Sequence, residues 1–91
     1  MASVSFLKVD YEEGDSYEGE WSADGKRNGL GSLKLKSGSV YTGQFQNGFF
    51  HGSGVLTFPD GSKYEGHFEF GKFHGYGIYV SQEGMKFEVG S

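Results

Sequence analysis

Tyr41-Thr42-Gly43-Gln44-Phe45 is one of three copies of an aromatic-x-Gly-x-aromatic pattern in this chain. The other copies are Tyr17-Glu18-Gly19-Glu20-Trp21 and Tyr64-Glu65-Gly66-His67-Phe68. The tyrosines that begin the three copies are 24 and then 23 residues apart. A repeat of this length indicates stacked supersecondary units, each in contact with its neighbours, rather than one closed globule.

Each copy alternates in the way that a two-faced β-strand does. Tyr41, Gly43 and Phe45 fall on one face of such a strand, and the polar residues between them fall on the other. The next segment, residues 46–51, contains Asn-Gly and predicts a hairpin loop before a second strand. A Pro-Asp-Gly segment then predicts a tight turn to the following hairpin. The sequence therefore predicts an all-β fold, an elongated single-layer antiparallel sheet with one hairpin per repeat.

The regular glycines suggest how such a sheet accommodates its aromatic residues. Gly43 and its equivalents lie between two large rings on one strand face, and Gly54 and its equivalents lie on the next strand. A glycine inside a strand weakens it by roughly 0.5–1 kcal/mol. Recurrent glycine beside recurrent aromatic residues therefore favours the packing of a ring against a glycine. The expected rows are Tyr17/Tyr41/Tyr64/Phe87, Trp21/Phe45/Phe68, Leu33/Leu56/Tyr79 and Leu35/Phe58.

The repeat divides the chain into one domain, residues 1–91, with incomplete units at both ends. Residues 4–11 match the second strand of a hairpin, so an N-terminal half-repeat is expected over residues 1–16. Three repeats follow at residues 17–40, 41–63 and 64–86, and residues 87–91 form a C-terminal edge strand. An open sheet with such edges is expected to self-associate through them.

The composition argues against several classes of function. Twelve acidic residues against eight basic ones give a formal charge of −4, which disfavours binding to nucleic acid. Because there is no cysteine, disulfides and thiolate metal sites are excluded. No apolar run approaches the roughly 18 residues of a membrane-spanning helix, and no signal-peptide pattern is present at the start of the chain. We therefore expect a cytoplasmic protein.

The sequence offers no constellation for catalysis, a metal or a cofactor. His51 and His74 occupy the position that Asn28 has in the first repeat. Asn at this position points to a hydrogen-bonding role near the hairpin loop, since a metal or catalytic site needs several converging ligands. The protein is therefore expected not to be an enzyme.

The three copies, each followed by Gly and a Gly-x-Gly pair, resemble MORN repeats. The stretch from Gly43 to Gly66 is similar to the small retinophilin-type MORN proteins. The resemblance implies an elongated, twisted sheet with a grooved aromatic face and the role of a non-enzymatic scaffold. Retinophilin-type members bind the tail of class III myosins, so the resemblance also implies a myosin-tail partner and an association with the cytoskeleton.

We expect a protein partner to bind along the aromatic face, because interfaces favour aromatic anchors. The expected contact residues are those of the rows together with three in the hairpin loops: Tyr17, Trp21, Tyr41, Phe45, Phe49, Phe50, Tyr64, Phe68 and Phe73. The alternative is a peripheral module that binds phosphoinositides or membrane lipid through basic residues. These are Lys26, Arg27, Lys34, Lys36, Lys63 and Lys72.

Overall fold

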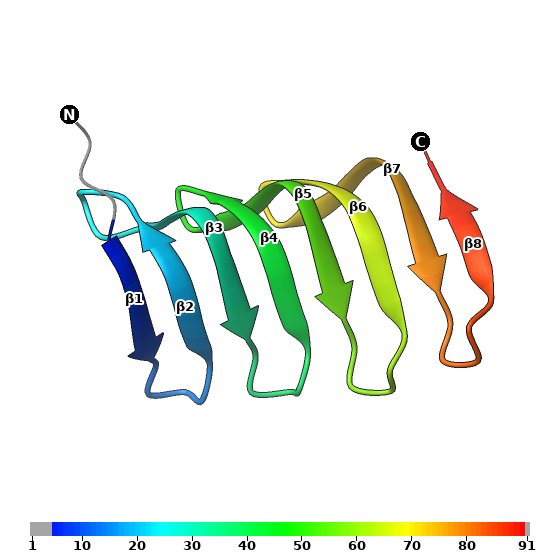
Figure 1. Cartoon of the computed structure of the whole chain (residues 1–91), viewed down its shortest axis with the longest axis horizontal. Helices are drawn as coiled ribbons and strands as arrows, with labels where there is room; N and C mark the ends of the chain where they lie inside the picture. The colour runs from blue at the N-terminus through cyan, green and yellow to red at the C-terminus, as the bar shows by residue number, and fades with distance from the viewer. Residues whose placement is uncertain (1–4, 91) are drawn as a thin grey trace.

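The computed structural model describes residues 5–90, which form one antiparallel sheet of eight strands (Figure 1). The strands are β1 (Ser5–Asp10), β2 (Ser16–Trp21), β3 (Arg27–Lys34), β4 (Val40–Gln46), β5 (Phe49–Thr57), β6 (Lys63–Glu69), β7 (Lys72–Val80) and β8 (Lys86–Val89). Their order in the sheet is their order in the chain. The predicted all-β hairpin sheet is therefore confirmed, and the part of the expected first strand before residue 5 lies outside the described residues.

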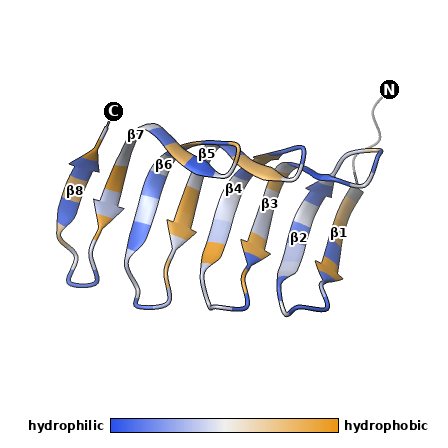
Figure 2. Ribbon diagram, turned by 180° about the vertical axis from the view of Figure 1, so that it is seen from behind, coloured by the Kyte–Doolittle hydropathy of each residue, from blue (hydrophilic) through white to orange (hydrophobic). Residues whose placement is uncertain are grey.

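The molecule is long in the direction in which the strands are stacked, with principal extents of 42 × 27 × 16 Å. Figure 1 shows the strands side by side from β1 to β8, with the upper ends of the β2–β3, β4–β5 and β6–β7 hairpins folded back. In Figure 2 the apolar residues recur as orange bands on β1, β3, β5 and β7. The apolar residues are thus distributed along the whole sheet, as expected for a stack of repeats.

A β-bulge bends each of the three long hairpins. The register shifts between Gly19 and Trp21 in the first hairpin, and at the equivalent places in the second and third. Bulges bend a strand and increase its twist. We call the parts beyond the bulges the arms, residues 21–27, 45–50 and 68–73.

The arms also hydrogen-bond to one another along the stack. Gly48 N–H, in the turn of the second arm, donates to the carbonyl of Arg27 at 2.9 Å. Gly71 N–H, in the turn of the third arm, donates to the carbonyl of Phe50 at 3.0 Å. The turns of the second and third arms are thereby each fixed to the arm before them.

The expectation that residues 46–51 form a loop is wrong. β4 continues to Gln46 and β5 begins at Phe49, so the turn consists of two residues. Asn47 and Gly48 have φ angles of 51° and 89°, and a two-residue hairpin turn of this kind needs positive φ at both positions. Because the tight turn leaves the strands paired to their ends, Phe49 and Phe50 lie in β5, and Phe73 lies in β7.

The core is a row of aromatic rings that meet edge to face. Its members, in spatial order, are Trp21, Tyr17, Phe45, Tyr41, Phe68 and Tyr64, with successive ring centroids 4.9–5.4 Å apart. Along a straight strand, positions 41 and 45 would be about 13 Å apart. The bulge brings their rings to 5.1 Å. Each such edge-to-face pair contributes about 0.5–1.5 kcal/mol beyond the burial of its area.

The structure confirms the predicted packing of a ring against a glycine. A Cβ atom built on Gly54 would lie 2.5 Å from Cε1 and Cζ of Tyr41, so only glycine leaves room for that ring. Gly31 and Gly77 stand in the same relation to Tyr17 and Tyr64. The glycine rows are therefore required by the aromatic core.

Candidate interaction surface

The rows of large aromatic rings are mostly buried and are therefore inaccessible to a binding partner. Tyr17, Tyr41, Phe45, Tyr64 and Phe68 retain only 0–4% of their surface. Trp21 is partly buried, and its indole N–H donates to the carbonyl of Leu7 at 3.2 Å. The expectation that these residues line an open aromatic groove is thus corrected, because the arms fold onto the aromatic face and fill it.

The buried tyrosines are held by hydrogen bonds as well as by packing. The hydroxyl of Tyr17 donates to the carbonyl of Glu20 at 2.7 Å, and that of Tyr41 donates to the carbonyl of Gln44 at 2.8 Å. Burial raises the pKa of each of these two hydroxyls to about 12. In the third repeat the hydroxyl of Tyr64 is buried and has no hydrogen-bond partner among the described residues.

These pKa values predict a loss of stability in alkali. In the unfolded chain a tyrosine ionises near pH 10, whereas Tyr17 and Tyr41 ionise near pH 12 in the folded protein. Above about pH 10 the unfolded state binds fewer protons than the folded state, so the free energy of unfolding falls as the pH rises. We expect this fall between about pH 10 and pH 12 in urea unfolding curves. A free energy of unfolding that stays constant to pH 12 would contradict it.

Three phenylalanines of the arms remain exposed. They are Phe49, Phe70 and Phe73, with 50%, 59% and 54% of their surface accessible. Phe49 and Phe70 belong to successive arms, and their rings meet at 6.2 Å. The ring of His51 lies 5.5 Å from that of Phe70. We call Phe49, His51 and Phe70 the arm patch.

Phe50 and Phe73 occupy equivalent positions in the second and third arms, on the side of the core rings. Phe50 stacks on Tyr41 with centroids 3.9 Å apart and is partly buried. Phe73 is its equivalent in the next hairpin and tilts over Tyr64 at 4.3 Å. Phe73 is more exposed because no further arm follows it among the described residues.

Phe70 was not among the residues expected from the sequence. It occupies the first position of the turn where the second hairpin has Asn47, and its φ angle is 50°. A bulky residue is rare in this left-handed conformation, whereas Asn is common there. The signal was present in the sequence as Phe-Gly in the place of Asn-Gly, and strain of this kind tends to occur at functional sites.

The aligned Asn28, His51 and His74 differ in what they bind. Oδ1 of Asn28 accepts the N–H of Asn47 at 3.1 Å, which is the hydrogen-bonding role expected for this position. Nδ1 of His51 is buried and lacks a partner among residues 5–90, and Nδ1 of His74 lies 3.4 Å from Oε1 of Glu69. In the described part of the chain no group of His, Asp and Glu is arranged to hold a metal ion.

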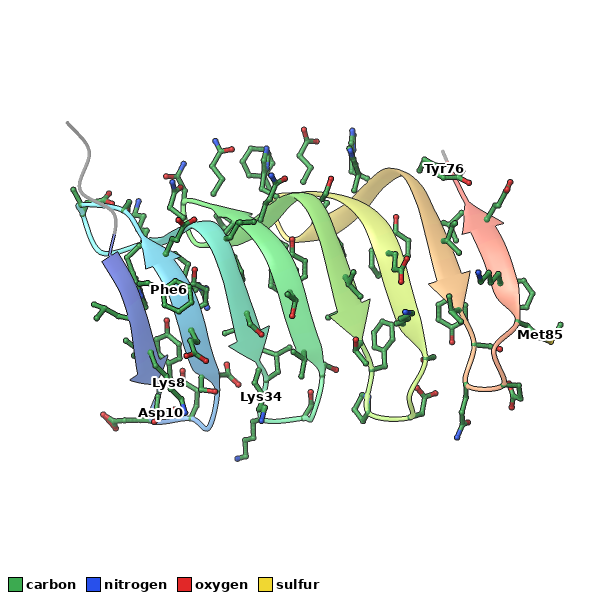
Figure 3. The ribbon with its side chains drawn as sticks, in the orientation of Figure 1. Phe6, Lys8, Asp10, Lys34, Tyr76 and Met85 are labelled. Atoms are coloured by element: carbon green, nitrogen blue, oxygen red, sulfur yellow. The ribbon has the colours of Figure 1, made fainter. Side chains whose placement is uncertain are left out.

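A second surface feature lies on the face opposite the aromatic core. It is a depression of about 640 Å³ between β5, β6 and β7, with His67, His74 and Tyr76 at its rim. Figure 3 shows Tyr76 projecting near the top of β7.

The basic residues do not form one patch. Lys26 and Lys72 lie at the arm ends of the hairpins, whereas Lys34 and Lys63 lie at the opposite ends of their strands. Lys63 is paired with Glu65 at 2.8 Å. Arg27 donates to the carbonyl of Gly48 at 2.8 Å and its guanidinium lies over the rings of the core. The described residues also include no helix long and apolar enough to cross a membrane.

Comparison with known proteins gives two matches. A family model described as MORN repeat matches residues 17–40, 41–63 and 64–86, which together are most of the chain. A curated protein of Drosophila melanogaster, MORN repeat-containing protein 4 homolog, is 49% identical to this chain over 38 residues. The aligned stretch covers 42% of this chain and 19% of that protein, so the similarity concerns only a small part of the relative.

Proposed function

The chain belongs to the MORN-repeat family, and on that basis we propose that it is a non-enzymatic interaction module that binds a protein partner through its arms. Proteins with these repeats typically take part in protein or membrane interactions. The partner contacts the arm patch, and Phe73 provides a further anchor at the C-terminal end of the row of arms.

The observation that carries this proposal is the exposure of neighbouring aromatic rings. Phe49 and Phe70 are each at least half exposed, although they touch one another. Aromatic residues are the commonest anchors of protein interfaces, and a cluster of them at the surface is typical of a binding site. The buried rows contribute by holding the arms rigid, which reduces the entropy lost on binding.

The first partner to test is the tail of a class III myosin, which the resemblance to retinophilin-type proteins implies. A helical or extended segment with apolar side chains along one side would place them against Phe49 and Phe70. Such contacts need neither a cofactor nor a metal.

The proposal is tested by fluorescence anisotropy with a purified, labelled class III myosin tail segment. We expect Phe49→Ser to weaken binding about tenfold, because the loss of an interface anchor typically costs more than 1 kcal/mol. The matched control is Phe6→Ser, since Phe6 is also an exposed phenylalanine but lies on β1.

The outcomes of this titration separate the possibilities. Equal binding by wild type and Phe49→Ser would place the contact elsewhere than the arm patch. If wild-type protein does not bind the tail but sediments with phosphoinositide vesicles, the membrane alternative would replace the proposal.

A further inference from the structure

The two outermost described strands, β1 and β8, correspond by their place in the repeat to the two strands of a single hairpin. Among the described residues, β1 and β8 each have a single neighbour. Phe87 of β8 faces Tyr79, as Tyr41 of β4 faces Leu33, so β8 corresponds to the first strand of a hairpin. β1 corresponds to the second strand, because Val9 faces Tyr17 just as Leu33 faces Tyr41.

We propose that copies of this chain associate head to tail, with β8 of one copy paired antiparallel to β1 of the next. The register follows from the β4–β5 pair, in which Tyr41 faces Leu56 and Thr42 faces Val55. At the equivalent positions of β8 and β1, the pairs are Lys86 with Asp10, Phe87 with Val9, Glu88 with Lys8, and Val89 with Leu7.

All four pairs of this register are complementary. Two of the pairs lie on the face opposite the aromatic core and join opposite charges, Lys86 with Asp10 and Glu88 with Lys8. The two pairs on the aromatic face are apolar. Opposite charges and apolar residues directly across from each other stabilise an antiparallel pair. Figure 3 shows that Lys8 and Asp10 follow one another along β1, the first strand of the sheet that the structure describes.

The alternation of aromatic and aliphatic side chains from strand to strand favours head-to-tail pairing over a two-fold pairing of identical edges. Across the sheet, each ring in the row of Tyr17, Tyr41 and Tyr64 faces an aliphatic residue on at least one neighbouring strand. The head-to-tail pair continues this row by placing Phe87 against Val9. A two-fold pair of β8 edges centred on this residue would instead place Phe87 against Phe87, although it too would join Lys86 to Glu88.

The new pair runs straight and has no arm. Leu7 and Val89 stand where the three long hairpins have paired glycines, and each faces a glycine on its present neighbour. Because side chains replace the paired glycines there, no aromatic ring can pack across the β8–β1 pair. This pair therefore does not bend as the three long hairpins do. Since the contact joins two different edges, each addition leaves one edge of each kind free, and the assembly grows beyond a dimer.

The test exchanges the charges on one edge at a time. The β1 variant is Lys8→Glu with Asp10→Lys, and the β8 variant is Lys86→Glu with Glu88→Lys. We expect sedimentation velocity to show concentration-dependent assemblies larger than a dimer for wild type. Each variant alone is expected to associate at least about tenfold more weakly, because both of its charge pairs become repulsive. An equimolar mixture of the two variants restores association, since every contact between unlike copies is again complementary.

The same experiment excludes the alternatives. In a two-fold pair, exchanging both charges of one edge leaves Lys opposite Glu, so unchanged association of the variants would overturn the head-to-tail proposal. Wild-type protein that stays monomeric at all concentrations would also overturn it. Circular dichroism and thermal unfolding of each variant establish that the fold is retained, which matters for Lys8→Glu because Lys8 faces Glu18 within the sheet.

Discussion

Gly54→Ala is expected to lower the melting temperature of this protein by about 15–30 °C. The added methyl group would lie 2.5 Å from Cε1 and Cζ of Tyr41, so the ring must leave its position. It then loses its stack on Phe50 and its edge-to-face contacts with Phe45 and Phe68. The loss of a large buried side chain from a core costs about 3–5 kcal/mol. A domain of this size has a total stability of about 5–14 kcal/mol.

A double-mutant cycle with Tyr41→Leu identifies the cause. Leucine lacks the outer ring atoms that meet the new methyl group, so Gly54→Ala should cost much less in the Tyr41→Leu background than in wild type. Gly61→Ala is a second comparison, because Gly61 has a φ angle of 92° and no neighbour within 4 Å. It carries only the cost of the left-handed backbone, about 1–2 kcal/mol. Additive effects of Gly54→Ala and Tyr41→Leu in thermal or urea unfolding would mean that the ring-on-glycine contact is not the reason for the glycine.

The strands and the glycine rows could be predicted because they depend on local patterns. Alternation about Gly43 gives the strand, and the recurrence of Gly54 one strand later requires only the period of the repeat. Both patterns are complete within two hairpins of the sequence.

The burial of the rings could not be read from the same patterns. Tyr41, Gly43 and Phe45 keep the alternation of a straight strand, yet a bulge follows Gly43 and folds Phe45 back toward Tyr41. Such a bulge changes the direction of the strand without changing the order of large and small residues along the sequence. The groove that the resemblance implies is therefore replaced by a filled core, which the alternation of residues alone does not reveal.

Part of the candidate interaction surface could be predicted from the sequence, and part depended on the conformation of a turn. Phe49 and Phe73 were expected to be available to a partner, and both are exposed, but as strand residues rather than loop residues. Phe70 was missed because its position in the turn is one that Asn47 fills in the preceding hairpin, and the aromatic residue there matches no rule of turn composition. The φ angle of 50° in the structure identifies it as a residue under strain.

Phe70→Asn is expected to stabilise the protein and at the same time to weaken partner binding. Left-handed backbone costs a bulky residue about 1–2 kcal/mol, and Asn adopts it at lower cost. Since Phe70 is exposed and makes only edge contacts with Phe49 and His51, little packing is lost. We expect a gain of about 0.5–1 kcal/mol in urea unfolding. Binding of the myosin tail segment should weaken about tenfold or more, because an anchor of the arm patch is removed.

Asn47→Gly provides the matched control, because it changes the same turn position in the preceding hairpin, where the φ angle is 51° and the side chain is already small and polar. It should leave both stability and tail binding close to wild type. A Phe70→Asn variant that is less stable than wild type would show that the ring packs more strongly than its backbone is strained. A variant that is more stable and binds equally well would remove Phe70 from the contact surface. Only a gain in stability together with a loss of binding fits a strained residue kept for its contact with a partner, because then the two properties oppose each other at one position.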